Sequence, residues 1–224
     1  MRTIVFDLDG TLADTSADLV AGANACLTAL GHRAALDPAS DRATAYEGGR
    51  SMLRLGLCRA GLDAEAAAAR ADSLYPRFLS HYETVLDRET RLFPGVVDAL
   101  EALAGAGCTL SICTNKPAAL AERLVARLGL DGRMAALVGA GTLDQRKPHP
   151  APYHAAVARA GGDAARSLLV GDSRTDRETA RAASVPCVLL PSGAAGPGAA
   201  ALAPEALIDG FGDLPDAVAR LLPR

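Results

Sequence analysis

The stretch Thr3-Ile4-Val5-Phe6-Asp7-Leu8-Asp9-Gly10-Thr11-Leu12 decides how this chain is expected to fold. It opens with β-branched and aromatic residues, a composition typical of a buried strand. Asp7 and Asp9 follow at once, and since side chains alternate along an extended chain, both should lie on one side, past the carboxyl end of the strand. Two neighbouring carboxylates repel each other unless a cation lies between them, so this pair favours a divalent metal held by oxygen ligands.

Strand-like runs alternate with helical patterns over most of the remaining chain. Apolar strands separated by helices indicate a parallel sheet covered on both faces, so we predict an α/β fold with a doubly wound, Rossmann-like sheet. Right-handed crossovers would bring the carboxyl ends of the strands to one edge. The strand-like runs are 109–113, 136–139, 167–170, 187–190 and 206–208, and the helical patterns are 96–104, 118–128, 152–160, 176–183 and 214–222.

One long segment interrupts this alternation. Helical patterns at 16–30, 49–60 and 64–85 have no strand-like run between them, and Pro94-Gly95 then signals a turn back to the sheet. We therefore predict an α/β core of residues 1–13 and 93–224 and an inserted helical cap domain of residues 14–92. Residues 192–204 are rich in Gly, Ala and Pro and predict a surface loop.

The composition argues against several classes of protein. A formal net charge of −3 and a pI near 5.8 give no basic surface for nucleic acid. No run approaches the roughly 20 apolar residues of a membrane span, and the chain opens on a core strand, so we expect neither a membrane anchor nor a signal peptide. The five cysteines are odd in number and lack CxxC spacing, as expected of reduced thiols in a cytoplasmic protein.

Further polar residues fall at or just after predicted strand ends. Thr114 and Asn115 follow the second strand of the sheet, Lys147 lies in the loop after the third, and Asp172 follows the fourth. A doubly wound sheet brings such ends together, so these residues should form one pocket. Carboxylates, a hydroxyl and a lysine in one pocket suit phosphoryl transfer, which needs a nucleophile, charge neutralisation and a metal.

This chemistry gives each residue a role. Asp7 would attack phosphorus and form an aspartyl phosphate. Asp9 would protonate the departing alkoxide and later take a proton from water. The Thr114 hydroxyl, the Asn115 backbone amide and the Lys147 ammonium would bind the phosphoryl oxygens.

The acids also predict a Mg²⁺ site. Asp172 would complete it together with Asp7 and Asp9, since Mg²⁺ prefers hard oxygen ligands. Asp176 lies one helical turn later and, with Ser173, would serve as a further ligand or orient the others.

A structural interpretation exists for each of these residues. Thr114 and Asn115 could cap a helix that begins near Pro117. Lys147 could be a solvated loop lysine, and Asp176 could cap a helix after a tight turn. Chance is a poor explanation for all of them occurring in order at successive strand ends.

The motifs Asp7-Leu8-Asp9-Gly10-Thr11-Leu12, Thr114-Asn115-Lys116-Pro117, Lys147-Pro148-His149-Pro150 and Gly171-Asp172-Ser173-Arg174-Thr175-Asp176 resemble those of the haloacid dehalogenase superfamily, in the same order. The resemblance spans nearly the whole chain and looks strongest to bacterial phosphoglycolate phosphatases, which carry a helical cap. It implies a Mg²⁺-dependent phosphomonoester hydrolase, monomeric or homodimeric, that acts on a small phosphorylated metabolite such as 2-phosphoglycolate.

Inside the predicted cap, the segment Tyr46-Glu47-Gly48-Gly49-Arg50 is expected to face the substrate. The glycines, Gly49 among them, permit a tight turn, and Arg50 could pair with a substrate carboxylate. Arg50 could equally be a solvated residue at a helix start. One departure from the family concerns Ser184, which stands where relatives commonly have Gly and where a left-handed helix end would cost roughly 1 kcal/mol.

Three other functions remain open at this point. A receiver-type signalling domain also carries an Asp, a Thr and a Lys at strand ends, but the acid at Asp9 would hydrolyse its phosphoryl group. A dehalogenase would not need both acids. A phosphoglucomutase-like transfer differs only in whether water or a second hydroxyl accepts the phosphoryl group, which the cap decides.

Overall fold

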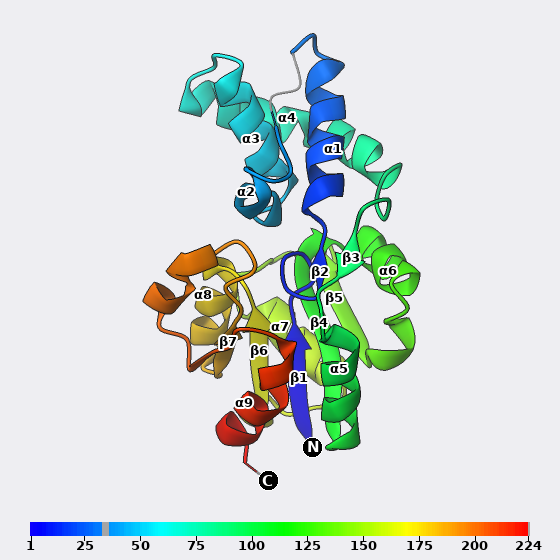
Figure 1. The fold of residues 1–224 in the computed structure, drawn as a ribbon, viewed down its shortest axis with the longest axis vertical. Helices are drawn as coiled ribbons and strands as arrows, with labels where there is room; N and C mark the ends of the chain where they lie inside the picture. Colours follow the sequence, from blue (N-terminus) through cyan, green and yellow to red (C-terminus); the bar gives the residue numbers. More distant parts are fainter. Residues whose placement is uncertain (33–35, 224) are drawn as a thin grey trace. The chain divides into compact units, whose positions relative to one another are not determined.

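The computed structural model describes residues 1–32 and 36–223, which form two compact units. The sheet unit comprises Met1–Ala13 and Leu92–Arg224, and the helical unit comprises Asp14–Arg91. The chain passes between them at two short strands, β2 (Ala13–Asp14) and β3 (Arg91–Leu92), which pair with each other (Figure 1). The helical unit is thus inserted directly after the first strand and the turn that follows it.

Six strands form the central sheet: β1 (Arg2–Phe6), β4 (Cys108–Pro117), β5 (Ala136–Ala140), β6 (Ser167–Gly171), β7 (Cys187–Leu189) and β8 (Ala206–Leu207). Their order is β5-β4-β1-β6-β7-β8, and every neighbouring pair is parallel. All five residues of the central strand β1 are buried. This arrangement confirms the predicted doubly wound α/β fold.

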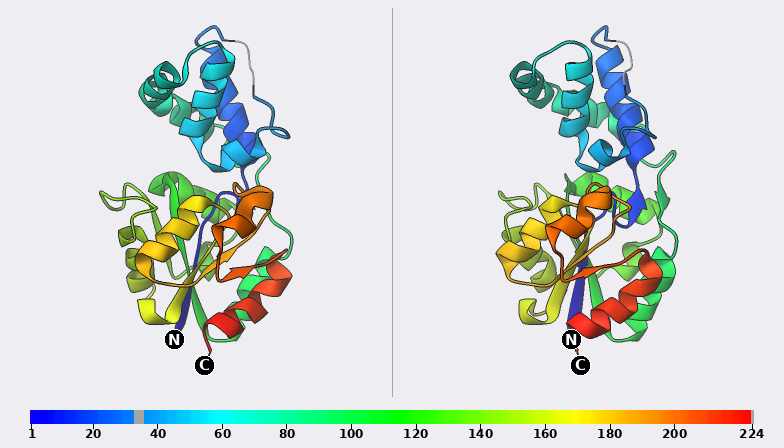
Figure 2. Two further views of the ribbon diagram at one scale, coloured as in Figure 1. Left: turned by 90° about the vertical axis from the view of Figure 1, so that its left-hand side faces the viewer. Right: turned by 60° about the vertical axis from the view of Figure 1, so that its left-hand side comes forward.

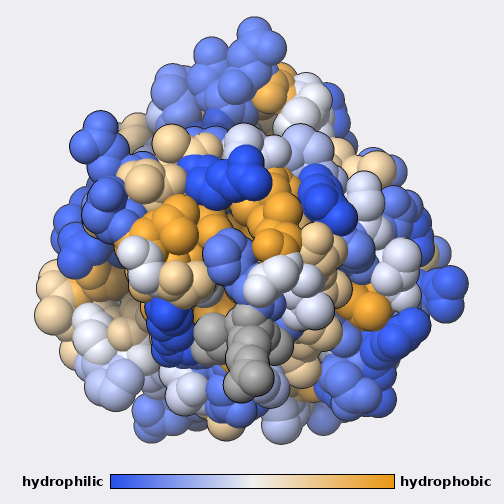
Figure 3. Space-filling view, turned by 90° about the horizontal axis from the view of Figure 1, so that it is seen from above, coloured by the Kyte–Doolittle hydropathy of each residue, from blue (hydrophilic) through white to orange (hydrophobic). Residues whose placement is uncertain are grey.

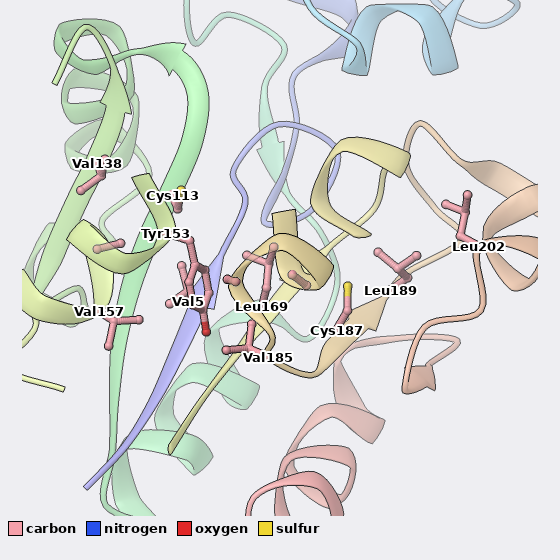
Figure 4. Close-up of a cluster of buried hydrophobic side chains, with 13 residues drawn as sticks. Val5, Cys113, Val138, Tyr153, Val157, Leu169, Val185, Cys187, Leu189 and Leu202 are labelled. Carbon is pink, nitrogen blue, oxygen red and sulfur yellow. The ribbon is translucent and has the colours of Figure 1, made fainter. Parts of the chain in front are cut away.

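Five helices accompany the sheet: α5 (Val96–Gly105), α6 (Ala118–Arg127), α7 (Ala151–Arg159), α8 (Arg174–Ala183) and α9 (Leu214–Leu221). They lie on both of its faces (Figures 1 and 2). Val5 and Leu169 point toward α7 and α8, where Tyr153 and Val157 complete a buried cluster (Figure 4). Since side chains alternate along β1, its other buried residues face the opposite side, where α5 packs against β4 and α9.

The helical unit contains α1 (Ser16–Thr28), α2 (Arg42–Tyr46), α3 (Gly49–Arg59) and α4 (Ala64–Glu83). The last of these packs against α1 and α3. A buried carboxylate, Asp18, accepts hydrogen bonds from the backbone amides of Glu89 and Thr90 and from the Thr90 hydroxyl, at 2.8–3.1 Å. This residue therefore fixes the start of the helical unit to its end.

Residues 192–204 and Ser184 show two details that the sequence did not predict in full. The predicted surface loop 192–204 is only partly exposed, because it contains a short 3₁₀ helix, Gly196–Leu202, that buries Ala199 and Leu202. Ser184 ends α8 in the left-handed region, with φ of 56° and ψ of 42°.

The surface carries few large hydrophobic side chains. On the face drawn in Figure 3, hydrophilic residues are interspersed with small hydrophobic groups. Among the described residues, the large hydrophobic side chains that are exposed are Met1 and Leu207. Within the described ranges, we find no helix with the length and apolar character needed to cross a membrane.

Candidate active site

The register of the sheet places residues of β4 and the end of β6 beside the end of β1. Phe6 pairs with Ile112 of β4 and with Val170 of β6. Thr114 and Asp172 each lie two residues beyond these partners, so both lie beside the segment that follows β1. Three of the predicted motifs therefore meet at one edge because the strands are parallel.

Lys147 joins this edge from the loop after β5. Its Nζ lies 2.6 Å from Asp176 Oδ1 and 3.0 Å from Asp7 Oδ1. The lysine is 3% exposed, so the interpretation as a solvated loop residue is wrong. An ammonium buried between two carboxylates is a charge-assisted contact that fixes all three side chains.

Asp172 is held by two segments that are distant in the sequence. The Thr11 hydroxyl donates to its Oδ1 at 2.6 Å, and the Ala194 amide donates to its Oδ2 at 2.6 Å. Thr11 reaches this position through a tight turn after β1, in which Gly10 adopts a φ of 81° that glycine tolerates best. A Cβ on Gly193 would lie 2.0 Å from Asp172 Oδ2, so the loop can close over the carboxylate only with glycine there.

Asp176 combines a structural and an electrostatic task. Its Oδ2 accepts from the backbone amide and hydroxyl of Ser173, and the Ser173 hydroxyl in turn accepts from the Asp176 amide, which makes a capping box at the start of α8. Its Oδ1 remains for Lys147. The prediction that Asp176 caps a helix and the prediction that it orients the site thus describe two oxygens of one carboxylate.

Burial and charge shift the pKa values of this cluster. Burial raises the pKa of Asp7 to about 6, although the ammonium of Lys147 opposes the rise. Burial, and then the neighbouring carboxylates of Asp176 and Asp7, raises the pKa of Asp172 well above its usual value. Burial acts to lower the pKa of Lys147, but the same two carboxylates outweigh it, so the pKa is raised and the lysine stays charged.

The donor set of the cluster fits a divalent cation. Carboxylate oxygens of Asp7, Asp172 and Asp176 lie within 4.8 Å of one another. Three acids share one ammonium, so the site carries excess negative charge in a buried position, and hard oxygen ligands of this kind suit Mg²⁺.

Asp9, which we predicted as a third ligand, lies outside this cluster of acids. Its carboxylate Oδ1 contacts Lys116 Nζ at 2.8 Å. Lys116 and Lys147 are the two lysines of the whole chain, and both are buried at this edge, while the other basic residues of the sequence are arginines. Each lysine therefore contacts a different acid of the first motif, and the assignment of Asp9 as a metal ligand stays a prediction.

Thr114 and Asn115 do not cap the helix that follows them. β4 continues through Pro117, and α6 begins without a side-chain cap. The Thr114 hydroxyl accepts from the Lys116 amide at 3.2 Å, and the Asn115 side chain contacts the loop of Lys147. The capping interpretation is thus wrong, and both residues face the edge of the sheet that carries the acids.

Within the helical unit, the two predicted specificity residues have partners of their own. Arg50 Nε lies 2.8 Å from Asp72 Oδ1, and its guanidinium carbon lies 3.5 Å from the centre of the Tyr75 ring. A Cβ on Gly49 would lie 2.1 Å from the ring of Phe78, so this glycine is required for packing between α3 and α4. Whether these residues also contact a substrate stays a prediction.

Sequence reasoning assigned no role to Thr11, Gly193, Ala194 or Lys116. Their partners are 107 to 161 residues away for Thr11 and Lys116, so only the folded sheet reveals the contacts. One feature of the sequence could have indicated Lys116: both lysines of the chain directly precede a proline, after a predicted strand or in a predicted loop. The loop around Gly193 gave no such indication, since its composition is typical of any surface turn.

Comparison with known proteins agrees with this geometry. Residues 4–190 match the model of a family described as haloacid dehalogenase-like hydrolase. A phosphoglycolate phosphatase of Agrobacterium fabrum is 38% identical over 215 residues, covering 96% of this chain and 91% of that protein. One from Xanthomonas campestris pv. campestris is 42% identical over 187 residues, covering 84% and 81%.

Solved structures give the same result for the fold. A structure described as a predicted phosphoglycolate phosphatase from Haemophilus somnus superposes with a TM-score of 0.79 at 25% identity, covering 96% of both chains. The family model matches most of the chain, and the two relatives are similar to it over most of their length. The chain therefore belongs to the haloacid dehalogenase-like hydrolase family and is a phosphatase.

Proposed function

We propose that this phosphatase hydrolyses 2-phosphoglycolate in the cytoplasm, with Mg²⁺, through an aspartyl phosphate on Asp7. The observation that carries the proposal is the buried contact of Lys147 with Asp7 and Asp176, next to Asp172. This arrangement supplies a nucleophile, a fixed positive charge and oxygen ligands within one small volume. The substrate is taken from the relatives that carry the name phosphoglycolate phosphatase.

The chemistry requires two displacements at phosphorus. In the first, a carboxylate oxygen of Asp7 bonds to phosphorus, the bond from phosphorus to the ester oxygen breaks, and Asp9 gives that oxygen a proton. In the second, Asp9 takes a proton from water, whose oxygen displaces Asp7 and releases phosphate. The ammonium of Lys116, 2.8 Å from Asp9 Oδ1, fixes the position of this carboxylate.

Donors from three segments bind the phosphoryl oxygens. We assign the Thr114 hydroxyl, the backbone amide of Asn115 and the Lys147 ammonium to this task, because charge develops on these oxygens during transfer. Asp7 and Asp172 would hold Mg²⁺, which would neutralise phosphoryl charge when bound. Asp176 and Ser173 keep Lys147 and α8 in place through the capping box.

The helical unit supplies the substrate contact in this proposal, as a cap. Arg50 pairs with Asp72 at the surface, where an ion pair contributes below about 1 kcal/mol, so a substrate carboxylate can replace Asp72 at little cost. Family membership sets aside the receiver-type alternative, because a stable phospho-switch is not a hydrolase.

The decisive experiment measures phosphate release by purified protein from 2-phosphoglycolate, sugar phosphates and an aryl phosphate, at several Mg²⁺ concentrations. We expect Mg²⁺-dependent release with the highest catalytic efficiency for 2-phosphoglycolate. Equal efficiency on all substrates would contradict the assigned substrate but not the chemistry. Isomerisation of a sugar phosphate without phosphate release would contradict hydrolysis and favour the mutase alternative.

Asp9→Asn and Asp172→Ala separate the two acidic roles. The first should stay slow even at saturating Mg²⁺, because the proton transfers assigned to Asp9 are lost whether or not the metal is bound. Excess Mg²⁺ should partly restore the second, because the role assigned to Asp172 is metal binding. Rescue of Asp9→Asn alone would reverse the assignment.

A further inference from the structure

The side chain of Asn115 makes two hydrogen bonds to the backbone of a single residue. Its Nδ2 donates to the Lys147 carbonyl at 2.9 Å, and its Oδ1 accepts from the Lys147 amide at 3.0 Å. A carboxamide thus occupies the place that a neighbouring strand would take in a sheet. Asn115 lies in the motif on β4 and Lys147 lies in the motif after β5, so this contact joins the two motifs directly.

Lys147 is placed by a loop and not by a strand. β5 ends at Ala140, so the backbone of Lys147 lies beyond the sheet ladder. Its ammonium must nevertheless lie 2.6 Å from Asp176 and 3.0 Å from Asp7. A backbone shift of about 1 Å would separate a buried ion pair, which is costly because both charges are already removed from water.

We propose that the Asn115 side chain is a positioning residue, which fixes the loop of Lys147 so that its ammonium stays on Asp7 during phosphoryl transfer. This inference rests on the proposed function. It assigns the side chain a task separate from that of the Asn115 backbone amide, which binds phosphate in the mechanism above. Because the two tasks use different atoms, a substitution can remove one and keep the other.

Asn115→Ala retains the backbone amide and removes both hydrogen bonds to Lys147. We expect the catalytic efficiency on an aryl phosphate to fall roughly ten- to a hundredfold, as when a supporting contact of a site is lost. In a Lys147→Met background the same substitution should change catalytic efficiency less than about twofold. A residue that acts only through the Lys147 ammonium has no further effect once that ammonium is absent. Equal fold losses in both backgrounds would overturn the proposal.

Asn24 offers a matched control. Its side chain makes the same pair of bonds to one residue, donating to the Leu36 carbonyl at 2.8 Å and accepting from the Leu36 amide at 3.3 Å, within the helical unit. Asn24→Ala should lower thermal stability about as much as Asn115→Ala. Any loss of catalytic efficiency that Asn24→Ala causes should be the same fold with and without the Lys147 side chain. This control distinguishes positioning of Lys147 from a general loss of stability.

A second measurement requires no turnover. Because the chain has two lysines, protein labelled with ¹⁵N-lysine gives two backbone amide signals, which Lys116→Arg and Lys147→Arg variants assign. Asn115→Ala should accelerate hydrogen exchange of the Lys147 amide at least tenfold, with Asn24→Ala leaving it unchanged. An unchanged Lys147 exchange rate in Asn115→Ala would overturn the proposal, whereas an inactive wild-type protein with the expected exchange would count against the proposed function alone.

Discussion

Two ion pairs, one in the sheet unit and one in the helical unit, use charge in opposite ways. In the sheet unit, the side chains of Lys147, Asp176 and Asp7 are 1%, 0% and 14% exposed. In the helical unit, Arg50 and Asp72 form their pair with 42% and 70% of the side chains exposed. A buried pair resists rearrangement, whereas an exposed pair exchanges partners readily. In the proposed function, the buried pair fixes the chemistry in the sheet unit, and substrate choice is left to an exposed pair that can change partners.

Replacing the nucleophile should give the largest effect. Asp7→Asn keeps the shape of the side chain and removes the attacking oxygen, so turnover should fall roughly 10⁴-fold or more on every substrate. Steady-state kinetics at saturating Mg²⁺ measures this, and circular dichroism with thermal unfolding shows that the fold is retained. Near-normal activity in a folded Asp7→Asn protein would contradict the assignment of Asp7 as the nucleophile, and with it the assignment of the chemistry to the sheet unit.

The loop that closes over Asp172 should be nearly as sensitive. Gly193→Ala places a methyl group where Asp172 Oδ2 now lies, so Mg²⁺ affinity and efficiency should fall roughly ten- to a hundredfold. Gly198→Ala in the same segment is the control, because a Cβ there meets nothing within 4 Å. Phosphate release measured against Mg²⁺ concentration distinguishes the two variants. Equal Mg²⁺ affinity and equal catalytic efficiency in both would mean that the loop does not position the Asp172 carboxylate.

Arg50 tests the other half of the comparison. Loss of a charge-assisted hydrogen bond costs about 1.5–3 kcal/mol, so Arg50→Ala should lower efficiency on 2-phosphoglycolate roughly ten- to a hundredfold. An aryl phosphate, which has no carboxylate, should be almost unaffected. The exposed Arg54 on the same helix provides the control substitution. Equal losses on both substrates would assign Arg50 to the packing of the helical unit, with Asp72 and Tyr75 as its partners.

The smallest effect should come from Ser184. It adopts φ of 56° at the end of α8, a conformation that costs a serine roughly 1 kcal/mol relative to glycine. Ser184→Gly should therefore raise the free energy of unfolding by about 1 kcal/mol without changing kinetic constants. Chemical denaturation measures the difference, and a destabilised variant would mean that the Ser184 side chain makes a compensating contact.

The sequence predicted those parts of the site that follow from local pattern. Asp7, Thr114 and Asp172 could be placed because each directly follows a predicted strand, and the carboxyl ends of parallel strands share one edge. Lys147 could be placed only near that edge, since the pattern does not show how a loop closes. Its burial and its contact with Asp176 emerge from the folded chain.

Local sequence patterns could not predict the contacts between distant segments. The hydrogen bond from Thr11 to Asp172 joins residues 161 positions apart, and nothing in either local sequence indicates the other. The composition around Gly193 correctly suggests a turn, but the 3₁₀ helix that follows depends on packing of Ala199 against the core. Arg50 shows the same limit, because its pairing with Asp72 depends on how α3 and α4 align.

The covalent intermediate is the central claim, and it can be observed directly. With an aryl phosphate, whose leaving group needs no proton from Asp9, the Asp9→Asn variant should accumulate phosphoenzyme, because it lacks the base that activates water. We would mix it with the aryl phosphate and Mg²⁺, quench with acid within milliseconds to seconds, and locate the phosphoryl group by peptide mass spectrometry. The account predicts a hydroxylamine-sensitive phosphoryl group on Asp7. A phosphoryl group on another side chain, or continued phosphate release with Asp7 unmodified throughout, would contradict it.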